Sequence, residues 1–157
     1  MIDWSEYDSY ALDSNFFIYA LDSTSLFFSA CDSFFKDLPS SKLKVVASVI
    51  TLTEVCTKPF TRKDLKIAKE VREFINGDGR IIVQEVTPVI AMRAAELRAR
   101  HPFLKLPDAI HLVTAHYHKV EAFVTADQRL QSVQVGDLKV ILLSNDDLLK
   151  KVALAGE

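Results

Sequence analysis

The sequence predicts an α/β fold, a three-layer α/β/α domain with a central, mainly parallel sheet. Short apolar runs alternate along the chain with longer runs whose apolar residues recur at helical spacing. Strands that are apolar almost throughout are typical of a parallel sheet, because helices cover both of its faces. The 157 residues suit one domain and contain no linker, so we expect a single domain over residues 1–157.

Five runs are predicted to be buried strands, because they are short and apolar and most of them are rich in β-branched residues. In chain order they are Tyr10–Leu12, Lys44–Ser48, Arg80–Gln84, Ala122–Thr125 and Lys139–Leu143. Helical signals fill the gaps between them, and this alternation is the order expected of an α/β domain.

The helices are predicted from the spacing of apolar residues and from the signals at helix ends. Pro39 and the serines after it end the first helix, and Gly77 and Gly79 close the third. Thr87 is the expected N-cap of the fourth helix, with Pro88 in its first turn. In chain order, the predicted helices cover residues 27–38, the segment after Ser48 that contains Glu54, and residues 65–75, 88–100 and 107–118.

The composition excludes several classes of protein. Hydrophobic residues make up 49% of the chain and charged residues 25%, which argues against intrinsic disorder. No apolar run approaches the roughly 20 residues of a membrane-spanning helix, and the acidic start lacks the features of a signal peptide. We therefore expect a cytoplasmic protein with no membrane contact. Its two cysteines, Cys31 and Cys56, are expected to be buried thiols.

Four acidic residues stand close to the ends of predicted strands. Asp13 follows the first strand directly, and Asp127 lies two residues beyond the fourth. Glu54 lies in the helix after the second strand, and Asp108 lies in the first turn of the helix that Pro107 opens. Ligand sites of open α/β sheets form at the carboxyl ends of the strands, so we expect these four side chains to meet there.

Such a group of carboxylates favours a bound cation. Two carboxylates about 4 Å apart repel each other by roughly 4 kcal/mol at an effective dielectric constant near 20. All-oxygen ligands suit Mg²⁺ or Mn²⁺, and two such ions can activate a water and stabilise the leaving oxygen in phosphodiester cleavage. Any single one of these acids is more simply explained as a helix cap or a solvated residue. Four of them at matching strand ends favour a metal site.

Four segments around these acids resemble, in order, the motifs of PIN-domain ribonucleases. They are Leu12–Asn15, Ser48–Val55 with the following Lys58 and Pro59, Leu106–Ala115, and Phe123–Leu130. Order and spacing fit that family over about residues 10–145, and the Leu-Pro-Asp-Ala-Ile element is most similar to VapC-type toxins of toxin–antitoxin pairs. One departure is Ser14, where the toxins often have threonine.

The resemblance implies a PIN-like fold and an endoribonuclease that depends on Mg²⁺ or Mn²⁺. By position, the catalytic acids would be Asp13, Glu54, Asp108 and Asp127. Asp13 and Asp108 would hold the principal ion, while Glu54 and Asp127 would bind through water or hold a second one.

The same resemblance implies supporting residues and partners. Asn15 and Thr125 would orient ligands or water by hydrogen bonds, and Ser48 and Thr51 would support the wall of the pocket. The expected partners are an RNA substrate, a cognate antitoxin and a second copy of the chain. The aromatic stripe from Phe27 to Leu38 is either a dimer surface or part of the core.

The sequence predicts the roles of the basic residues and histidines less specifically than those of the four acids. Arg129, close after Asp127, is a candidate contact for an RNA phosphate, and so is Lys58. With Arg62, Lys63 and Lys66, Lys58 forms a basic stretch that is either a phosphate track or a solvated helix face. Structural or surface roles are expected for the histidines at positions 111, 116 and 118, because no cysteine or further histidine completes a metal site.

Other functions stay open beside the toxin. A free-standing RNA-processing nuclease would carry the same motifs, and a catalytically idle PIN domain would bind RNA or a protein partner. No acid of the set is missing, which disfavours the idle form. A phosphotransferase or receiver-like domain is disfavoured because position 15 is asparagine and no lysine follows a strand at the right place. Neither a P-loop nor a G-x-G-x-x-G motif is present, so ATP or dinucleotide binding has no support.

The net charge of −2 is unlike that of most polyanion-binding proteins, which are basic. Setting aside the four proposed ligands leaves 17 acidic residues against 19 basic ones. The near-neutral total therefore does not exclude RNA. It does predict weak non-specific affinity and a shallow dependence of binding on salt.

Overall fold

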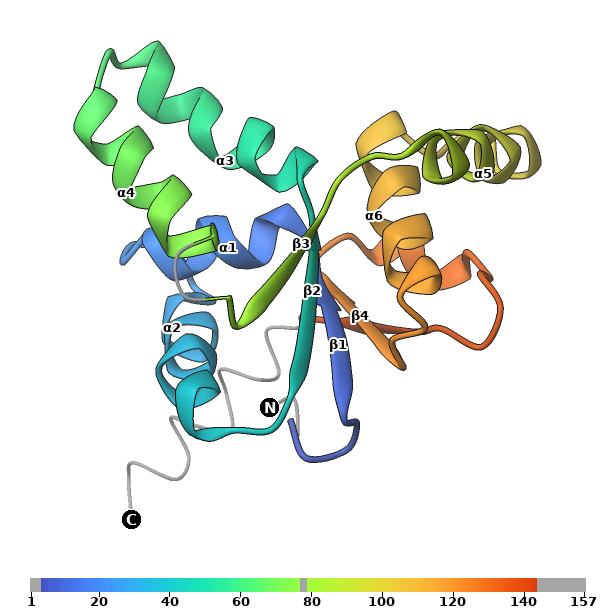
Figure 1. Ribbon diagram of the computed structural model, residues 1–157, viewed down its shortest axis with the longest axis horizontal. Coiled ribbons are helices and arrows are strands. Elements are labelled where there is room, and N and C mark those ends of the chain that lie inside the picture. The colour runs from blue at the N-terminus through green and yellow to red at the C-terminus, as the bar shows by residue number, and fades with distance from the viewer. Residues whose placement is uncertain (1–3, 77–78, 144–157) are drawn as a thin grey trace.

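The computed structural model describes residues 4–76 and 79–143, and these form a three-layer α/β/α fold (Figure 1). One sheet has the strand order β3-β2-β1-β4-β5, and all of its pairings are parallel. Its strands are β1 (Ser9–Leu12), β2 (Lys44–Ser48), β3 (Ile81–Gln84), β4 (Ala122–Thr125) and β5 (Lys139–Leu142). The predicted fold class and strands are confirmed, and no strand end differs from its prediction by more than one residue.

Helices cover both faces of the sheet, with α1 to α4 on one side and α5 and α6 on the other (Figure 1). The described helices are α1 (Ser14–Leu21), α2 (Phe28–Asp37), α3 (Ile50–Thr61), α4 (Leu65–Asn76), α5 (Pro88–Arg100) and α6 (Leu106–Tyr117), with short 3₁₀ turns η1 (Leu38–Ser40) and η2 (Gln128–Ser132). The predicted helices are confirmed. Helix α1 was not predicted, because its eight residues are too few to show a clear helical repeat.

Alternate residues of the central strand point to opposite faces of the sheet, as the two-residue period of a strand requires. Tyr10 and Leu12 pack into a core with residues of α1 to α4. Ala11, between them, packs into a second core with residues of α5 and α6. All three are buried, so β1 is enclosed on both faces and provides a rigid base for the residues that follow it.

The aromatic stripe of α2 belongs to the first core. Phe34 packs against Trp4 and Phe16, with ring centroids 4.3 and 5.3 Å away. Cys31 of the same helix is fully buried, and its thiol is free. Cys31, Phe34 and Leu38 of the stripe are therefore part of the core, whereas Phe27, Phe28 and Phe35 are only partly buried. Trp4 and Tyr7, which precede β1, also pack against this core.

Two end signals act as predicted. Thr87 caps α5, because its Oγ1 accepts a hydrogen bond from the backbone N–H of Ile90 at 3.3 Å. Pro39 lies in η1, directly after α2. Within the described ranges, every helix is too short or too polar to cross a membrane.

The topology brings three strand ends together. β1 lies between β2 and β4, and the backbone N–H of Asp13 continues the ladder to the carbonyl of Val124 at 3.0 Å. Helix α1 begins directly after β1, and η2 begins three residues after β4. The side chains that leave these strands therefore share one edge of the sheet.

Candidate active site

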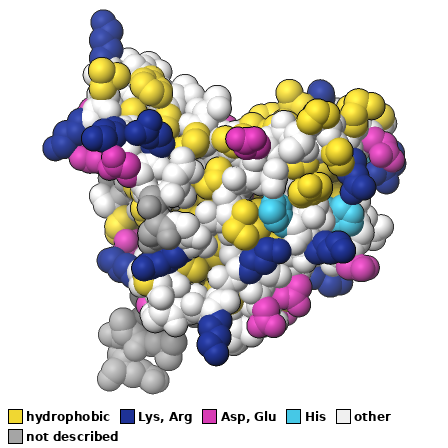
Figure 2. All heavy atoms as spheres, in the orientation of Figure 1, with side chains coloured by type: hydrophobic (Ala, Val, Ile, Leu, Met, Phe, Trp, Pro, Cys, Tyr) yellow, Lys and Arg dark blue, Asp and Glu magenta, His cyan; other side chains and the backbone are white. Residues whose placement is uncertain are grey.

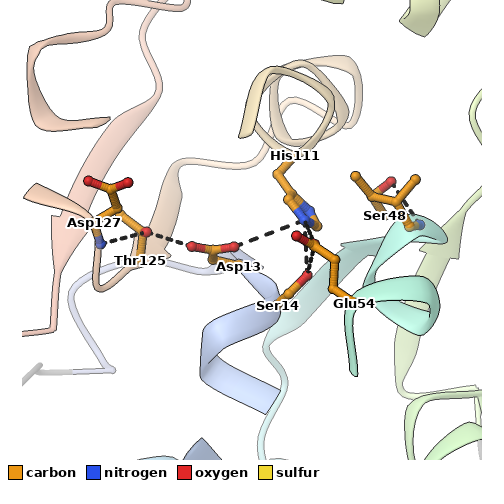
Figure 3. Close-up of polar contacts among 8 residues, drawn as sticks. Asp13, Ser14, Ser48, Glu54, His111, Thr125 and Asp127 are labelled. Atoms are coloured by element: carbon orange, nitrogen blue, oxygen red, sulfur yellow. Dashed lines mark hydrogen bonds and ion pairs between the residues drawn. The ribbon is translucent and has the colours of Figure 1, made fainter. Parts of the chain in front are cut away.

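Asp13 lies at the centre of the group. It is the N-cap residue of α1 and only 6% exposed, and its Oδ2 accepts a hydrogen bond of 2.6 Å from Thr125 Oγ1 at the end of β4 (Figure 3). The other oxygen, Oδ1, lies 4.0 Å from Nε2 of His111 on α6. Thr125 is fully buried, so its hydroxyl holds one oxygen of Asp13 in a defined place. An orienting role of Thr125 toward a ligand or water stays a prediction.

Glu54 reaches the same place from α3. Its Oε2 accepts hydrogen bonds from Ser14 Oγ and, at 2.8 Å, from His111 Nε2 (Figure 3). Ser14 Oγ and His111 Nε2 are themselves 3.0 Å apart, so three elements meet in one triangle of polar atoms. Burial acts to raise the pKa of Glu54, but the hydrogen bonds from His111 and Ser14 outweigh it and hold that pKa below its ordinary value. Glu54 is therefore a carboxylate at neutral pH.

Asp108 faces the group from the first turn of α6. Its pKa is raised, first because the carboxyl group is partly buried and then because the charges of Asp13 and Asp127 repel a third negative charge. The charges of His111 and Arg129 act in the opposite direction without cancelling these effects. Asp13 and Asp127 are therefore both close enough to Asp108 to oppose its ionisation.

Asp127 caps η2 and is held by Arg129. Its Oδ1 accepts from the backbone N–H of Arg129 at 3.0 Å and from Nε at 2.9 Å, and its Oδ2 accepts from Nε at 3.1 Å and from Nη2. The hydrogen bonds from Arg129 lower the pKa of Asp127, against the opposing effect of burial. The backbone N–H of Asp127 donates to Thr125 Oγ1 at 3.1 Å, which links this residue to Asp13 (Figure 3).

No side-chain hydrogen bond joins the other predicted residues to the acids in the part of the chain that the structure describes. Ser48 Oγ accepts from the backbone N–H of Ile50 at 3.5 Å and so helps to begin α3. Thr51 is fully buried, and its hydroxyl has no hydrogen-bond partner in the part of the chain that the structure describes. Asn15 is half-buried in the first turn of α1. Ser48 and Thr51 make no direct contact with the carboxylates among the contacts described above, and their role in supporting the pocket wall stays a prediction.

Lys58 lies beside the site. It lines a groove of about 470 Å³ between α1, α3 and α4, and Glu54 and Arg62 line the same groove. Lys and Arg side chains gather over the α3–α4 end of the molecule (Figure 2). Lys66 instead pairs with Glu70 one turn along α4, at 3.8 Å on the exposed face. The basic stretch is therefore divided between a groove next to Glu54 and a solvated helix face.

His111 and Ser14 are the site residues that sequence analysis missed. His111 is 2% exposed, so of the two expected roles, structural or surface, only a structural one fits it. His118 contacts Gln84 Oε1 at 2.7 Å. A signal was present, since His111 follows Asp108 by three residues and lies on the same side of the helix. In the sequence, Ser14 stands out only as a departure from the motif.

Comparison with known proteins identifies the family. Residues 10–136 match the PIN domain, and this match covers most of the chain. The chain belongs to the PIN-domain family. PIN domains are nucleases. Comparison with curated proteins gave no significant match.

Solved structures share this PIN fold. VapC20 of Mycobacterium tuberculosis, described as a sarcin-ricin loop cleaving toxin, matches with a TM-score of 0.67 and 16% identity over 83% of this chain and 98% of its own. VapBC2 of Rickettsia felis, bound to a fragment of promoter DNA, matches with a TM-score of 0.64 and 14% identity over 87% and 99%. A toxin–antitoxin complex from Klebsiella pneumoniae matches at 0.58 and 21% over 86% and 96%.

The donor chemistry of this PIN domain suits a hard divalent cation. The ionisation of Asp108 is opposed by Asp13 and Asp127, and a cation would relieve that conflict. Among residues 4–76 and 79–143, no group of three or more histidine, cysteine, aspartate or glutamate side chains is arranged as a metal site. Glu54 and Asp127 are instead held by His111 and Arg129.

Proposed function

We propose that this PIN domain is a metal-dependent endoribonuclease and the toxin of a VapBC-type toxin–antitoxin pair. One observation carries the proposal. Asp13, Asp108 and Asp127 come from three different elements at the carboxyl edge of the sheet, yet they lie close enough for two of them to raise the pKa of the third. Stability alone gives no reason to gather three acids at one place, because their charges repel. A function that needs a bound cation gives such a reason.

Mg²⁺ or Mn²⁺ would be held principally by Asp13 and Asp108, with Glu54 and Asp127 bound through water or holding a second ion. When bound, the cation supplies an activated water and neutralises charge on the phosphodiester group. The chain's own residues fix the carboxylates. Thr125 holds Oδ2 of Asp13 by a hydrogen bond, and His111 and Ser14 hold Oε2 of Glu54 in the same way.

The proposed RNA contacts are Arg129 and Lys58. The Arg129 side chain is 52% exposed and stands next to Asp127, where its guanidinium can reach a phosphate. Lys58 shares a groove with Glu54, so a strand that leaves the acids along this groove would pass its ammonium group. Asn15 is proposed to orient a ligand or a water from the first turn of α1.

An antitoxin and a second copy of the chain are the proposed protein partners, and the cytoplasm is the proposed location. The antitoxin is supported by the similar structures, of which VapBC2 and the Klebsiella pneumoniae protein are toxin–antitoxin complexes. An antitoxin peptide would lie across the acids and place an arginine or lysine near them. A complex with no contact to Asp13, Asp108 or Asp127 would contradict this part of the proposal.

The activity is tested with purified protein and RNA. Cleavage is expected with Mg²⁺ or Mn²⁺ and is expected to stop with EDTA. Asp13→Asn and Asp108→Asn should each abolish cleavage, because each removes a charge from the proposed ion site. Asp137→Asn is the matched control, since this exposed residue precedes β5 and so lies toward the opposite end of the sheet. Cleavage by Asp108→Asn at the wild-type rate would show that the site is wrongly assigned.

Growth distinguishes a toxin from a free-standing nuclease. Expression of the chain without its genomic neighbour should arrest growth, and expression of Asp13→Asn should not. Cleavage in vitro together with unchanged growth would favour the free-standing RNA-processing nuclease. If neither cleavage nor arrest is seen, although the folded protein binds RNA, the catalytically idle form is favoured.

A further inference from the structure

Both oxygens of Asp127 are already occupied by Arg129. The guanidinium contacts Oδ1 through Nε and Oδ2 through Nε and Nη2, so it binds the carboxylate in a bidentate manner. The backbone N–H of Arg129 adds a further contact to Oδ1 that no side-chain substitution removes. A cation that binds Asp127 must therefore share or replace the contacts of the Arg129 side chain.

The charge of Arg129 also reaches Asp108. It lowers the pKa of Asp108 in part, and Asp108 in turn stabilises the charged guanidinium. Arg129 thus stands beside two of the acids that the proposed function assigns to the cation. The guanidinium therefore supplies, from within the chain, positive charge that offsets the negative charges of Asp108 and Asp127.

We propose that Arg129 and the divalent cation compete for Asp127, and that a phosphodiester group of RNA releases Asp127 by taking over the guanidinium. RNA and the cation then bind cooperatively. RNA that binds the guanidinium frees Asp127 for the cation, and a cation that binds Asp127 frees the guanidinium for RNA. This inference rests on the proposed metal-dependent ribonuclease, and it assigns Arg129 a second role in addition to contact with phosphate.

The exposure of the pair makes such an exchange feasible. The side chains of Arg129 and Asp127 are 52% and 23% exposed, so water already reaches both partners. An ion pair this exposed is weak, and its loss is expected to change the affinity of a competing cation by about two- to fivefold. Phosphate accepts the planar guanidinium with the same two-pronged geometry as a carboxylate, so the N–H groups of Arg129 stay satisfied after the exchange.

Calorimetric titration with Mn²⁺ alone tests the competition. Arg129→Gln should bind Mn²⁺ about two- to fivefold more tightly than the wild type, because Asp127 loses its side-chain partner. Lys105→Gln is the matched control: this exposed lysine also acts on Asp127 by its charge, but forms none of the hydrogen bonds to it described above. Arg129→Lys keeps the positive charge but loses the bidentate guanidinium, so its affinity for Mn²⁺ should lie between those of the wild type and Arg129→Gln.

A second titration tests the link to RNA. A short 2′-O-methyl RNA should tighten Mn²⁺ binding to the wild type, and should do so less or not at all in Arg129→Gln. The same oligonucleotide with uncharged methylphosphonate linkages should have no such effect in either protein. Cleavage of unmodified RNA by the wild type is measured in parallel.

Several results would overturn the inference. Equal Mn²⁺ affinity in the wild type and Arg129→Gln would do so, and so would an equal gain in Lys105→Gln, since charge alone would then explain it. An oligonucleotide effect of the same size in the wild type and Arg129→Gln would also do so. In each case a wild type that binds Mn²⁺ and cuts RNA leaves the proposed function standing. A wild type that does neither contradicts both.

Discussion

At the scale of single residues, His111 shows how a buried polar side chain can serve the acids around it. A carboxylate can only accept hydrogen bonds, so His111 donates to Glu54 through Nε2. Its Nδ1 is buried and has no partner among the described residues. A side chain placed for stability alone would be expected to satisfy both ring nitrogens. We infer that His111 is a positioning residue whose main contact is Glu54.

Two substitutions at this position separate positioning from packing. His111→Leu removes the donor to Glu54, so we expect its cleavage rate to fall by about 10- to 100-fold, as for other residues that orient metal ligands. His111→Gln keeps a side-chain N–H and should recover part of that loss. Rates are compared at saturating RNA, and unfolding in urea checks that both variants are folded. Equal rates in the two folded variants would contradict the positioning role.

The stability of these variants has an expected pH dependence. The folded pKa of Glu54 lies below its unfolded value, so the Glu54 contacts stabilise the fold above the unfolded pKa, and this contribution is lost as pH falls through the folded pKa. His111→Leu should therefore lose less stability between neutral and acidic pH than the wild type does.

At the scale of elements, α6 joins the site to the second core. Asp108 and His111 lie one turn apart on α6 and face the acids, while Ala109, Leu112 and Val113 of the same helix are buried in the core with α5. Helix α6 is thus held by α5 on one side while it presents polar groups on the other. The position of α5 matters to the site for this reason, although α5 contributes none of its acids.

The cap of α5 gives a prediction at this scale. Thr87→Ala removes the acceptor for the backbone N–H of Ile90, and the unfolding free energy should fall by about 1 kcal/mol. Thr87→Ser keeps the hydroxyl and should stay close to the wild type. Urea unfolding followed by circular dichroism measures both. Equal losses in the two variants would mean that the threonine methyl group, and not the cap, is what matters.

At the scale of the whole molecule, the sheet separates two buried cores. Cys31 lies in the core on the side of α1 to α4, where burial raises the pKa of its thiol to about 12. A thiol with such a pKa is almost wholly protonated near neutral pH, and the thiolate is the form that reacts. Reaction of Cys31 therefore requires the core to open.

Thiol labelling is expected to report global unfolding. In a Cys56→Ala variant, iodoacetamide at about pH 8 should modify Cys31 only at the rate at which the protein unfolds, and addition of urea should accelerate labelling in step with the loss of helical signal. Burial also raises the pKa of Cys56, which is removed so that it does not contribute. Rapid labelling of the native variant would show that this core is open to solvent.

Much of the fold could be predicted because it depends on local signals. Short stretches of sequence predict the β-branched strands, the Thr87 cap and the order of strands and helices. The positions of the four acids were also predictable, since each lies next to a strand end or in the first turns of a helix. Helix α1 escaped prediction because it is short, and Phe16 and Phe17 are buried by tertiary contacts that no local pattern reveals.

The α/β class, the family motifs and the four candidate acids can all be read from the printed sequence. How those acids are held depends on the tertiary structure. His111 contacts Glu54 across 57 positions of the chain, and Thr125 contacts Asp13 across 112. Contacts between such distant positions depend on strand order and helix packing, which bring together residues that share no local pattern. The hydrogen bonds from the Arg129 side chain to Asp127 join residues only two positions apart. They depend on side-chain orientation, which spacing in the sequence does not specify.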